Sequence, residues 1–108
     1  MEREDSLIAN FKEFYGTAKR SFETGDFTVA YTLFYKALVT VADILVFKKR
    51  GIIPRNHKHR FEVLPYVDME LLGALSGMFE DYTKTYSSRM SQDDCKDIME
   101  TVEKYVLV

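Results

Sequence analysis

"GDFTVAYTLFYKALVTVADILVFKKRG", residues 25 to 51, is the stretch that decides the fold. Its apolar residues recur in alternating steps of four and three, the repeat of a helix that packs along one seam. The seam consists of Phe27, Tyr31, Phe34, Leu38, Val41 and Leu45. The polar residues form only a narrow stripe: Thr28, Thr32, Lys36, Thr40 and Asp43. A helix this apolar is central in its bundle or is covered by another chain. We therefore predict a central helix from Phe27 to Arg50, ended by Gly51.

The segment before this helix also has helical periodicity. One face would hold Leu7, Phe11, Phe14, Ala18 and Phe22. Asp5 or Ser6 can cap this first helix at its start, and Gly25 can end it. Asp26 is then placed to cap the central helix.

Three more helical segments follow the central helix. Asn56 can cap a short helix that runs through Leu64, and Asp68 can cap a third long helix. The inner face of that long helix is expected to hold Leu72, Leu75, Phe79, Tyr82 and Tyr86. "SQDD", residues 91 to 94, has the form of a capping box before the last helix. That helix is expected to bury Cys95, Ile98, Met99, Val102, Tyr105 and Val106.

These segments predict an all-α fold. Because the connections are short, neighbouring helices should be antiparallel. We expect an up-down antiparallel bundle of four main helices, with a short extra helix between the second and the third. The 108 residues, 46% hydrophobic and 30% charged, suit a single domain over residues 1–108.

The amino-acid composition disfavours several classes of function. The net charge of -2 does not suit a general polyanion binder. The single cysteine, Cys95, cannot form an intramolecular disulfide, and one thiolate is too few for a structural zinc or iron–sulfur site. The N-terminal "MEREDSLIAN" is charged where a signal peptide would be apolar. We expect a soluble, cytoplasmic protein with no cofactor.

A basic stretch, "KKRGIIPRNHKHR" at residues 48 to 60, holds both histidines and no acidic residue. Cationic side chains near a helix start suit an anion. The candidate ligand-binding residues here are Arg55, His57, Lys58, His59 and Arg60. We expect Arg55, Lys58 and Arg60 to be exposed, so that phosphate binding would depend strongly on salt. The alternative is a solvated loop after a helix end. The two-residue spacing of the histidines places them on different helix faces, which disfavours a metal site.

A second group of candidates is Tyr82, Lys84 and Tyr86. The tyrosines could stack a base beside a lysine that binds phosphate. The competing interpretation is core packing, because Tyr82 and Tyr86 are one helical turn apart on the predicted inner face.

Two resemblances add to these patterns. "GDFTVAYTLFYKAL", residues 25 to 38, resembles the second helix of a tetratricopeptide repeat at Gly25, Asp26, Phe27, Ala30, Phe34, Ala37 and Leu38. This resemblance covers one repeat, and Ala42 stands where that repeat has a proline. It implies a peptide-binding adaptor.

The second resemblance covers nearly the whole chain. "RGIIPRNHKHRFEVL" at residues 50 to 64, "DYTKTYSSRMSQDD" at residues 81 to 94 and the order of helices are similar to the HEPN superfamily of small prokaryotic helical bundles. The resemblance implies a homodimer, which we expect through the central helix. It also implies a small nucleotidyltransferase as partner, a nucleotide or RNA as ligand, and in some members a toxin–antitoxin ribonuclease.

The ribonuclease motif of that superfamily is an Arg, four to six residues and a His near the start of the last helix. No His follows His59. Arg50 and His57 have the required spacing, but they lie in the connection after the central helix and not near the last helix. We therefore favour a non-enzymatic HEPN-like protein without catalytic residues, which binds a protein partner and a nucleotide or RNA. The alternatives are a ribonuclease using Arg50 or Arg55 with His57 or His59, and the tetratricopeptide-like adaptor.

Overall fold

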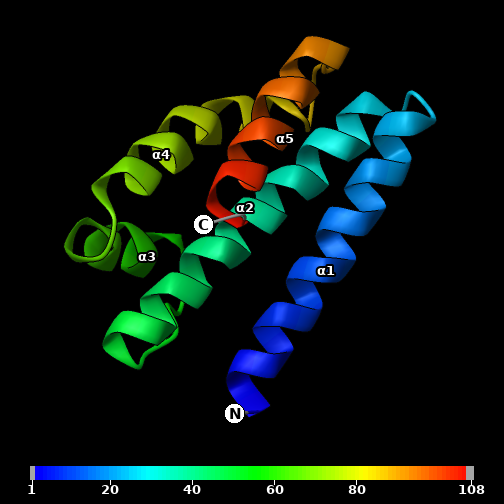
Figure 1. Ribbon diagram of the computed structural model, residues 1–108. Coiled ribbons are helices and arrows are strands. Elements are labelled where there is room, and N and C mark those ends of the chain that lie inside the picture. Colours follow the sequence, from blue (N-terminus) through cyan, green and yellow to red (C-terminus); the bar gives the residue numbers. More distant parts are fainter. Residues whose placement is uncertain (1, 107–108) are drawn as a thin grey trace.

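The computed structural model describes residues 2–106, and within them the chain is helical without strands. Five α-helices and one 3-10 turn follow in the order α1 (Glu2–Glu23), α2 (Phe27–Arg50), α3 (His57–Val63), η1 (Leu64–Tyr66), α4 (Met69–Lys84) and α5 (Gln92–Val106) (Figure 1). The predicted all-α class is confirmed, as is the short helix that separates the second and third long helices.

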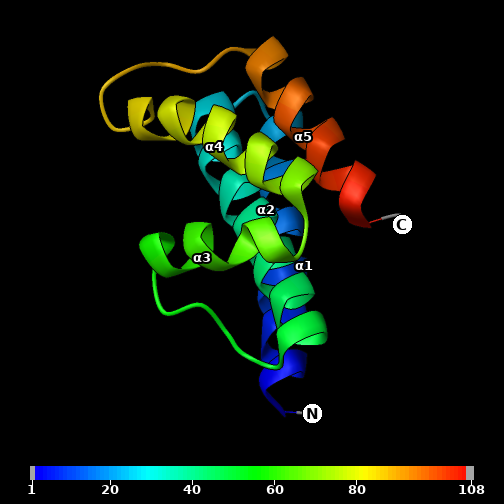
Figure 2. The ribbon, with the colours of Figure 1, turned by 90° about the vertical axis from the view of Figure 1, so that its left-hand side faces the viewer.

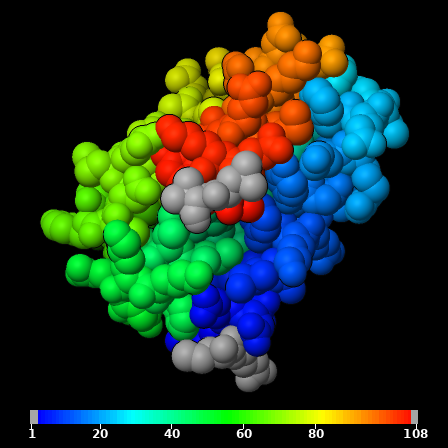
Figure 3. Space-filling model, viewed as in Figure 1, coloured from blue at the N-terminus to red at the C-terminus, as the bar shows by residue number. Residues whose placement is uncertain are grey.

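The long helices are arranged around α2. α1 and α4 run opposite to α2, whereas α5 runs in the same direction, and α4 crosses α2 obliquely (Figures 1 and 2). In the space-filling view, α1 and α5 cover most of α2 on that face (Figure 3). α2 is therefore the central helix that its apolar sequence predicts.

The core is built mainly from α2. Its buried apolar residues are Ala30, Tyr31, Phe34, Tyr35, Ala37, Leu38, Val41, Ala42, Val46 and Phe47. Other helices add Ala18, Leu64, Leu71, Leu75, Cys95, Ile98 and Val102. By length and composition α2 could also cross a membrane, but 61% of its most apolar window is buried inside the molecule, as in the core helix of a compact fold.

The predicted helix ends are largely confirmed. Gly25 and Gly51 have φ angles of 83° and 72°, in the left-handed region that favours glycine. Asn56 and Asp68 each accept a hydrogen bond of 2.9 Å from the backbone N–H three residues later. The predicted capping box before α5 is present. The Ser91 backbone N–H donates to the Asp94 carboxylate at 2.9 Å, and the Asp94 backbone N–H donates to the Ser91 hydroxyl at 3.1 Å.

The predicted N-cap of α1 is wrong, and that of α2 is confirmed in position only. α1 begins at Glu2, before Asp5 and Ser6, and Glu4 of this extra turn forms an ion pair with Lys48 of α2. α1 therefore begins earlier than its apolar pattern indicates. Asp26 occupies the N-cap position of α2 as predicted, but its side chain makes no capping hydrogen bond and accepts the Thr24 hydroxyl at 2.9 Å instead.

Two residues predicted to be buried are exposed. Tyr86 has 81% of its surface exposed, because α4 ends at Lys84 and helical periodicity no longer places Tyr86 on the inner face. Val106 is 45% exposed at the last residue of α5, beyond the buried Cys95, Ile98 and Val102.

Candidate functional site

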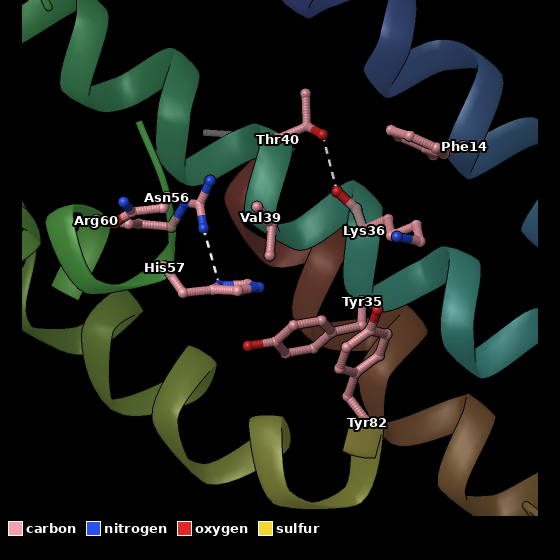
Figure 4. Close-up of a pocket in the computed structure, with 9 residues that line it drawn as sticks. All are labelled: Phe14, Tyr35, Lys36, Val39, Thr40, Asn56, His57, Arg60 and Tyr82. Carbon is pink, nitrogen blue, oxygen red and sulfur yellow. Dashed lines mark hydrogen bonds between the residues drawn. The ribbon is translucent and has the colours of Figure 1, made fainter. Parts of the chain in front are cut away.

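A cavity of about 340 Å³ lies where α3 and the end of α4 approach the middle of α2. Nine residues line it: Phe14, Tyr35, Lys36, Val39, Thr40, Asn56, His57, Arg60 and Tyr82 (Figure 4). They come from four helices and from the residue that caps α3, so the fold has to be complete before the cavity exists.

A buried ion pair fixes α3 against α2. Arg60 donates to both carboxylate oxygens of Asp43, from Nε at 2.7 Å and from the terminal nitrogen Nη2 at 2.9 Å. The expectation that Arg60 is exposed is wrong, and Asp43 is buried rather than part of a solvent-facing stripe. Each charge can be buried because the other satisfies it through a two-pronged hydrogen bond.

The remaining guanidinium nitrogen of Arg60, Nη1, fixes the tautomer of His57. Arg60 Nη1 lies 2.9 Å from His57 Nδ1. Because a guanidinium only donates, Nδ1 accepts and the ring proton resides on Nε2. Partial burial lowers the pKa of His57 below its ordinary value, and the charge of Arg60 lowers it further. The ring therefore enters the cavity from α3 as a neutral hydrogen-bond donor (Figure 4).

Two tyrosines form the aromatic side of the cavity. The Tyr35 and Tyr82 rings are stacked, with centroids 4.6 Å apart and planes at 20°. The Tyr35 hydroxyl donates to the Leu75 carbonyl at 3.2 Å, and burial raises the pKa of Tyr35, so its phenol stays neutral. Lys36 Nζ lies 5.9 Å from the centroid of the Tyr82 ring, within cation–π range.

The cavity is electropositive. Among the described residues that line it, none carries a carboxylate. Arg60 is neutralised by Asp43, whereas Lys36 is exposed and has no ion-pair partner among residues 3 to 106. The arrangement therefore provides one available cation, the Nε2–H donor of His57 and an aromatic surface. These groups together suit an anion that is joined to a flat ring.

The predicted site residues separate into two groups. His57, Arg60 and Tyr82 line the cavity. Arg55 and Lys58 are exposed, and neither they nor His59 line the cavity. The backbone N–H of Arg55 donates to His59 Nδ1 at 3.1 Å, so that each histidine has its Nδ1 engaged by a different residue.

The second predicted group is also divided. Lys84 forms an exposed ion pair with Asp81, at 3.5 Å, and the cation over the Tyr82 ring is Lys36 instead. Tyr86 meets Tyr82 edge-on, with ring centroids 6.2 Å apart and planes at 76°. Arg50, one of the two arginines that the ribonuclease alternative could use, is exposed at the end of α2 and does not line the cavity.

Six lining residues were not predicted from the sequence: Phe14, Tyr35, Lys36, Val39, Thr40 and Asn56. A signal for Lys36 was present, because Lys36 interrupts a helix that is otherwise predicted to be central, as does Asp43, which holds Arg60 of the lining. A charge in a central helix needs a partner or a polar cavity.

The comparisons with known proteins do not extend this description. No protein-family model matches the chain, and no curated protein and no solved structure is significantly similar to it.

Proposed function

We propose that this protein is a non-enzymatic, HEPN-like binding protein whose cavity takes a nucleotide or RNA. One observation carries the proposal: Lys36 and His57 flank the stacked Tyr35 and Tyr82 in a cavity whose described lining has no carboxylate. In the bound state Lys36 and the Nε2–H of His57 hold phosphate oxygens. The base then packs against Tyr82, since every base offers a π-face to an aromatic ring.

The same geometry supports binding rather than cleavage. A histidine acts as a general base through an unprotonated nitrogen that reaches the substrate. In His57 the unprotonated nitrogen accepts from Arg60, and the nitrogen directed away from Arg60 carries the proton. Cleavage by His57 would first require the Arg60 contact to break.

Calorimetric titration with adenosine monophosphate, at low and moderate salt, tests the proposal. We expect weak binding that declines as salt is added. Lys36→Ser should lower the affinity about tenfold, as for the loss of one charge-assisted hydrogen bond. Lys96→Ser is the matched control, because Lys96 is exposed on α5 outside the cavity and the change in net charge is the same.

The aromatic contribution has its own pair of variants. Tyr82→Phe keeps the ring and should retain binding, whereas Tyr82→Ser should lose about five- to a hundredfold in affinity. Circular dichroism checks that both variants remain helical. Absence of binding by the parent protein at low salt would refute the proposal, as would equal effects of Lys36→Ser and Lys96→Ser.

We also propose that the protein forms a homodimer through α2. α1 and α5 leave an apolar groove of about 220 Å³ along this helix, and the groove is lined by Ile8, Phe11, Val41, Ile44, Leu45, Lys48, Tyr105 and Val106. Sedimentation equilibrium should show a dimer that Ile44→Glu converts to a monomer. Val29→Glu, at an exposed position of α2 outside the groove, should leave the dimer intact. A monomeric parent protein would refute this assembly.

The HEPN resemblance supports a small nucleotidyltransferase as the protein partner in the cytoplasm. The two purified proteins should elute together in gel filtration, and the Ile44→Glu variant would show whether the same groove is used. Separate elution of the parent protein and a nucleotidyltransferase encoded beside it would remove this partner from the proposal.

A further inference from the structure

An aromatic series leads from the cavity to the surface at the end of α4. Tyr35 is buried, with 1% of its surface exposed, Tyr82 is half-buried at the cavity wall, and Tyr86 is 81% exposed. Successive rings are in contact, because the centroids are 4.6 Å apart for Tyr35 and Tyr82 and 6.2 Å apart for Tyr82 and Tyr86. The cavity thus continues into an exposed aromatic ring.

We propose that Tyr86 is a second base-stacking position and that the ligand of this site is single-stranded nucleic acid rather than a mononucleotide. The inference rests on the proposed function, since it needs a first base at Tyr82. The next nucleotide along the strand would then stack its base on the open face of Tyr86.

The geometry of the two rings requires a single strand. Their centroids are 6.2 Å apart and their planes are at 76°, so two bases stacked on them are neither parallel nor in contact. Successive bases in a duplex are about 3.4 Å apart and parallel. Only an unpaired strand can spread its bases in this way onto aromatic side chains.

Two exposed cations lie close to Tyr86 in the sequence. Residues 82 to 91, "YTKTYSSRMS", contain Lys84 and Arg89 and no acidic residue, although Glu80, Asp81, Asp93 and Asp94 flank this segment. Both cations are exposed, although Lys84 forms an exposed ion pair with Asp81. Lys36 is placed beside Tyr82, where the phosphate of the first nucleotide would lie. Exposed cations beside a stacking ring are the usual combination in proteins that bind single strands.

A second exposed tyrosine provides the control. Tyr66 is 76% exposed, almost as much as Tyr86, but it does not line the cavity and has no stacked ring among the described residues. A tyrosine exposed by itself needs no functional explanation. What distinguishes Tyr86 is its contact with Tyr82.

The test compares two probes, adenosine monophosphate and a single-stranded adenosine pentanucleotide, by titration with the full chain at low salt. We expect the pentanucleotide to bind more tightly than the mononucleotide. Tyr86→Ser should weaken pentanucleotide binding about five- to a hundredfold and leave mononucleotide binding unchanged. Tyr66→Ser should change neither. Ribose and deoxyribose forms of the pentanucleotide distinguish RNA from DNA.

Failure of this inference is distinguishable from failure of the proposed function. If Tyr86→Ser binds the pentanucleotide as the parent does while the mononucleotide still binds, Tyr86 is not a stacking position and the cavity takes a mononucleotide. Equal affinity of the parent for both probes would lead to the same conclusion. If neither probe binds, the proposed function fails and the second position fails with it.

Discussion

The two sides of α2 are held in different ways. Towards α1 the contact is apolar: Ala18 of α1 is completely buried, and Tyr15 packs edge-on against Phe34 with centroids 6.0 Å apart. Towards α3 the contact is polar, because Asp43 of α2 holds Arg60, and Arg60 holds His57. The space left beside α1 is therefore an apolar groove, whereas the space left beside α3 is a cavity with polar groups in its lining.

The two sides differ in how strongly the stability of the fold depends on a single contact. An apolar interface is the sum of many small contacts, and it tolerates substitutions that conserve volume. The polar side depends on a few directional hydrogen bonds between buried charges. Removal of one partner leaves the other charge buried and unpaired. We therefore expect the largest single-residue effects on the polar side.

Removal of Asp43 should give the largest effect. In Asp43→Ala the Arg60 guanidinium stays buried without its partner, so unfolding free energy should fall by about 3–5 kcal/mol. Urea denaturation followed by helical circular dichroism measures the loss. The double variant Asp43→Leu, Arg60→Met removes both charges and should recover most of the stability, because no uncompensated charge is left. A loss of less than about 1 kcal/mol in Asp43→Ala would show that water reaches Arg60 and that the ion pair is accessible to solvent.

Overfilling the apolar side should have an intermediate effect. Ala18 has no exposed surface, and Leu at this position would force α1 away from α2, at a cost of about 1–3 kcal/mol. Ala9→Leu is the matched control, because Ala9 is exposed on the same helix and the change should stay within about 0.5 kcal/mol. Equal denaturation midpoints for the two variants would mean that the α1–α2 contact is loose enough to accept a larger side chain.

The same contrast explains what the sequence could predict. The seam of α2, the glycine turns and the caps at Asn56, Asp68 and Ser91 are local, and periodicity or a fixed spacing reveals them. Asp43 and Arg60 are 17 residues apart, and no local pattern says that they meet. The basic stretch contributes Asn56, His57 and Arg60 to the cavity, although Arg60 was expected to face solvent. Helical spacing also placed Tyr86 in the core, because the sequence does not mark the end of α4 at Lys84.

The titration of His57 should add a modest pH dependence to the polar side. The folded pKa of His57 lies below its ordinary value of 6.5, so just below that value the unfolded chain binds more protons than the folded one. Stability is therefore complete above about pH 6.5 and decreases as the pH falls towards the folded pKa. His57→Gln keeps an acceptor for Arg60 and removes the titration. Thermal melts near pH 7.5 and near pH 5.5 should differ more for the parent than for this variant. The same difference in both proteins would assign the pH dependence to other groups.

The smallest effect on stability is expected at the exposed part of the basic stretch. Arg55→Ser with Lys58→Ser removes two exposed cations that make no side-chain contact with the cavity lining, so the unfolding free energy should change by about 0.5 kcal/mol or less. Arg60→Ser, in the same stretch, should lose several times more unfolding free energy, because it leaves Asp43 buried and unpaired.

Nucleotide binding by the Arg55→Ser, Lys58→Ser double variant tests whether these two residues contact the ligand. If Arg55 and Lys58 act only through long-range attraction, the double variant should weaken nucleotide binding at low salt and match the parent at moderate salt. A deficit that persists at moderate salt would mean that one of them contacts the phosphate directly, and the binding site would then extend from the cavity along the exposed face of α3.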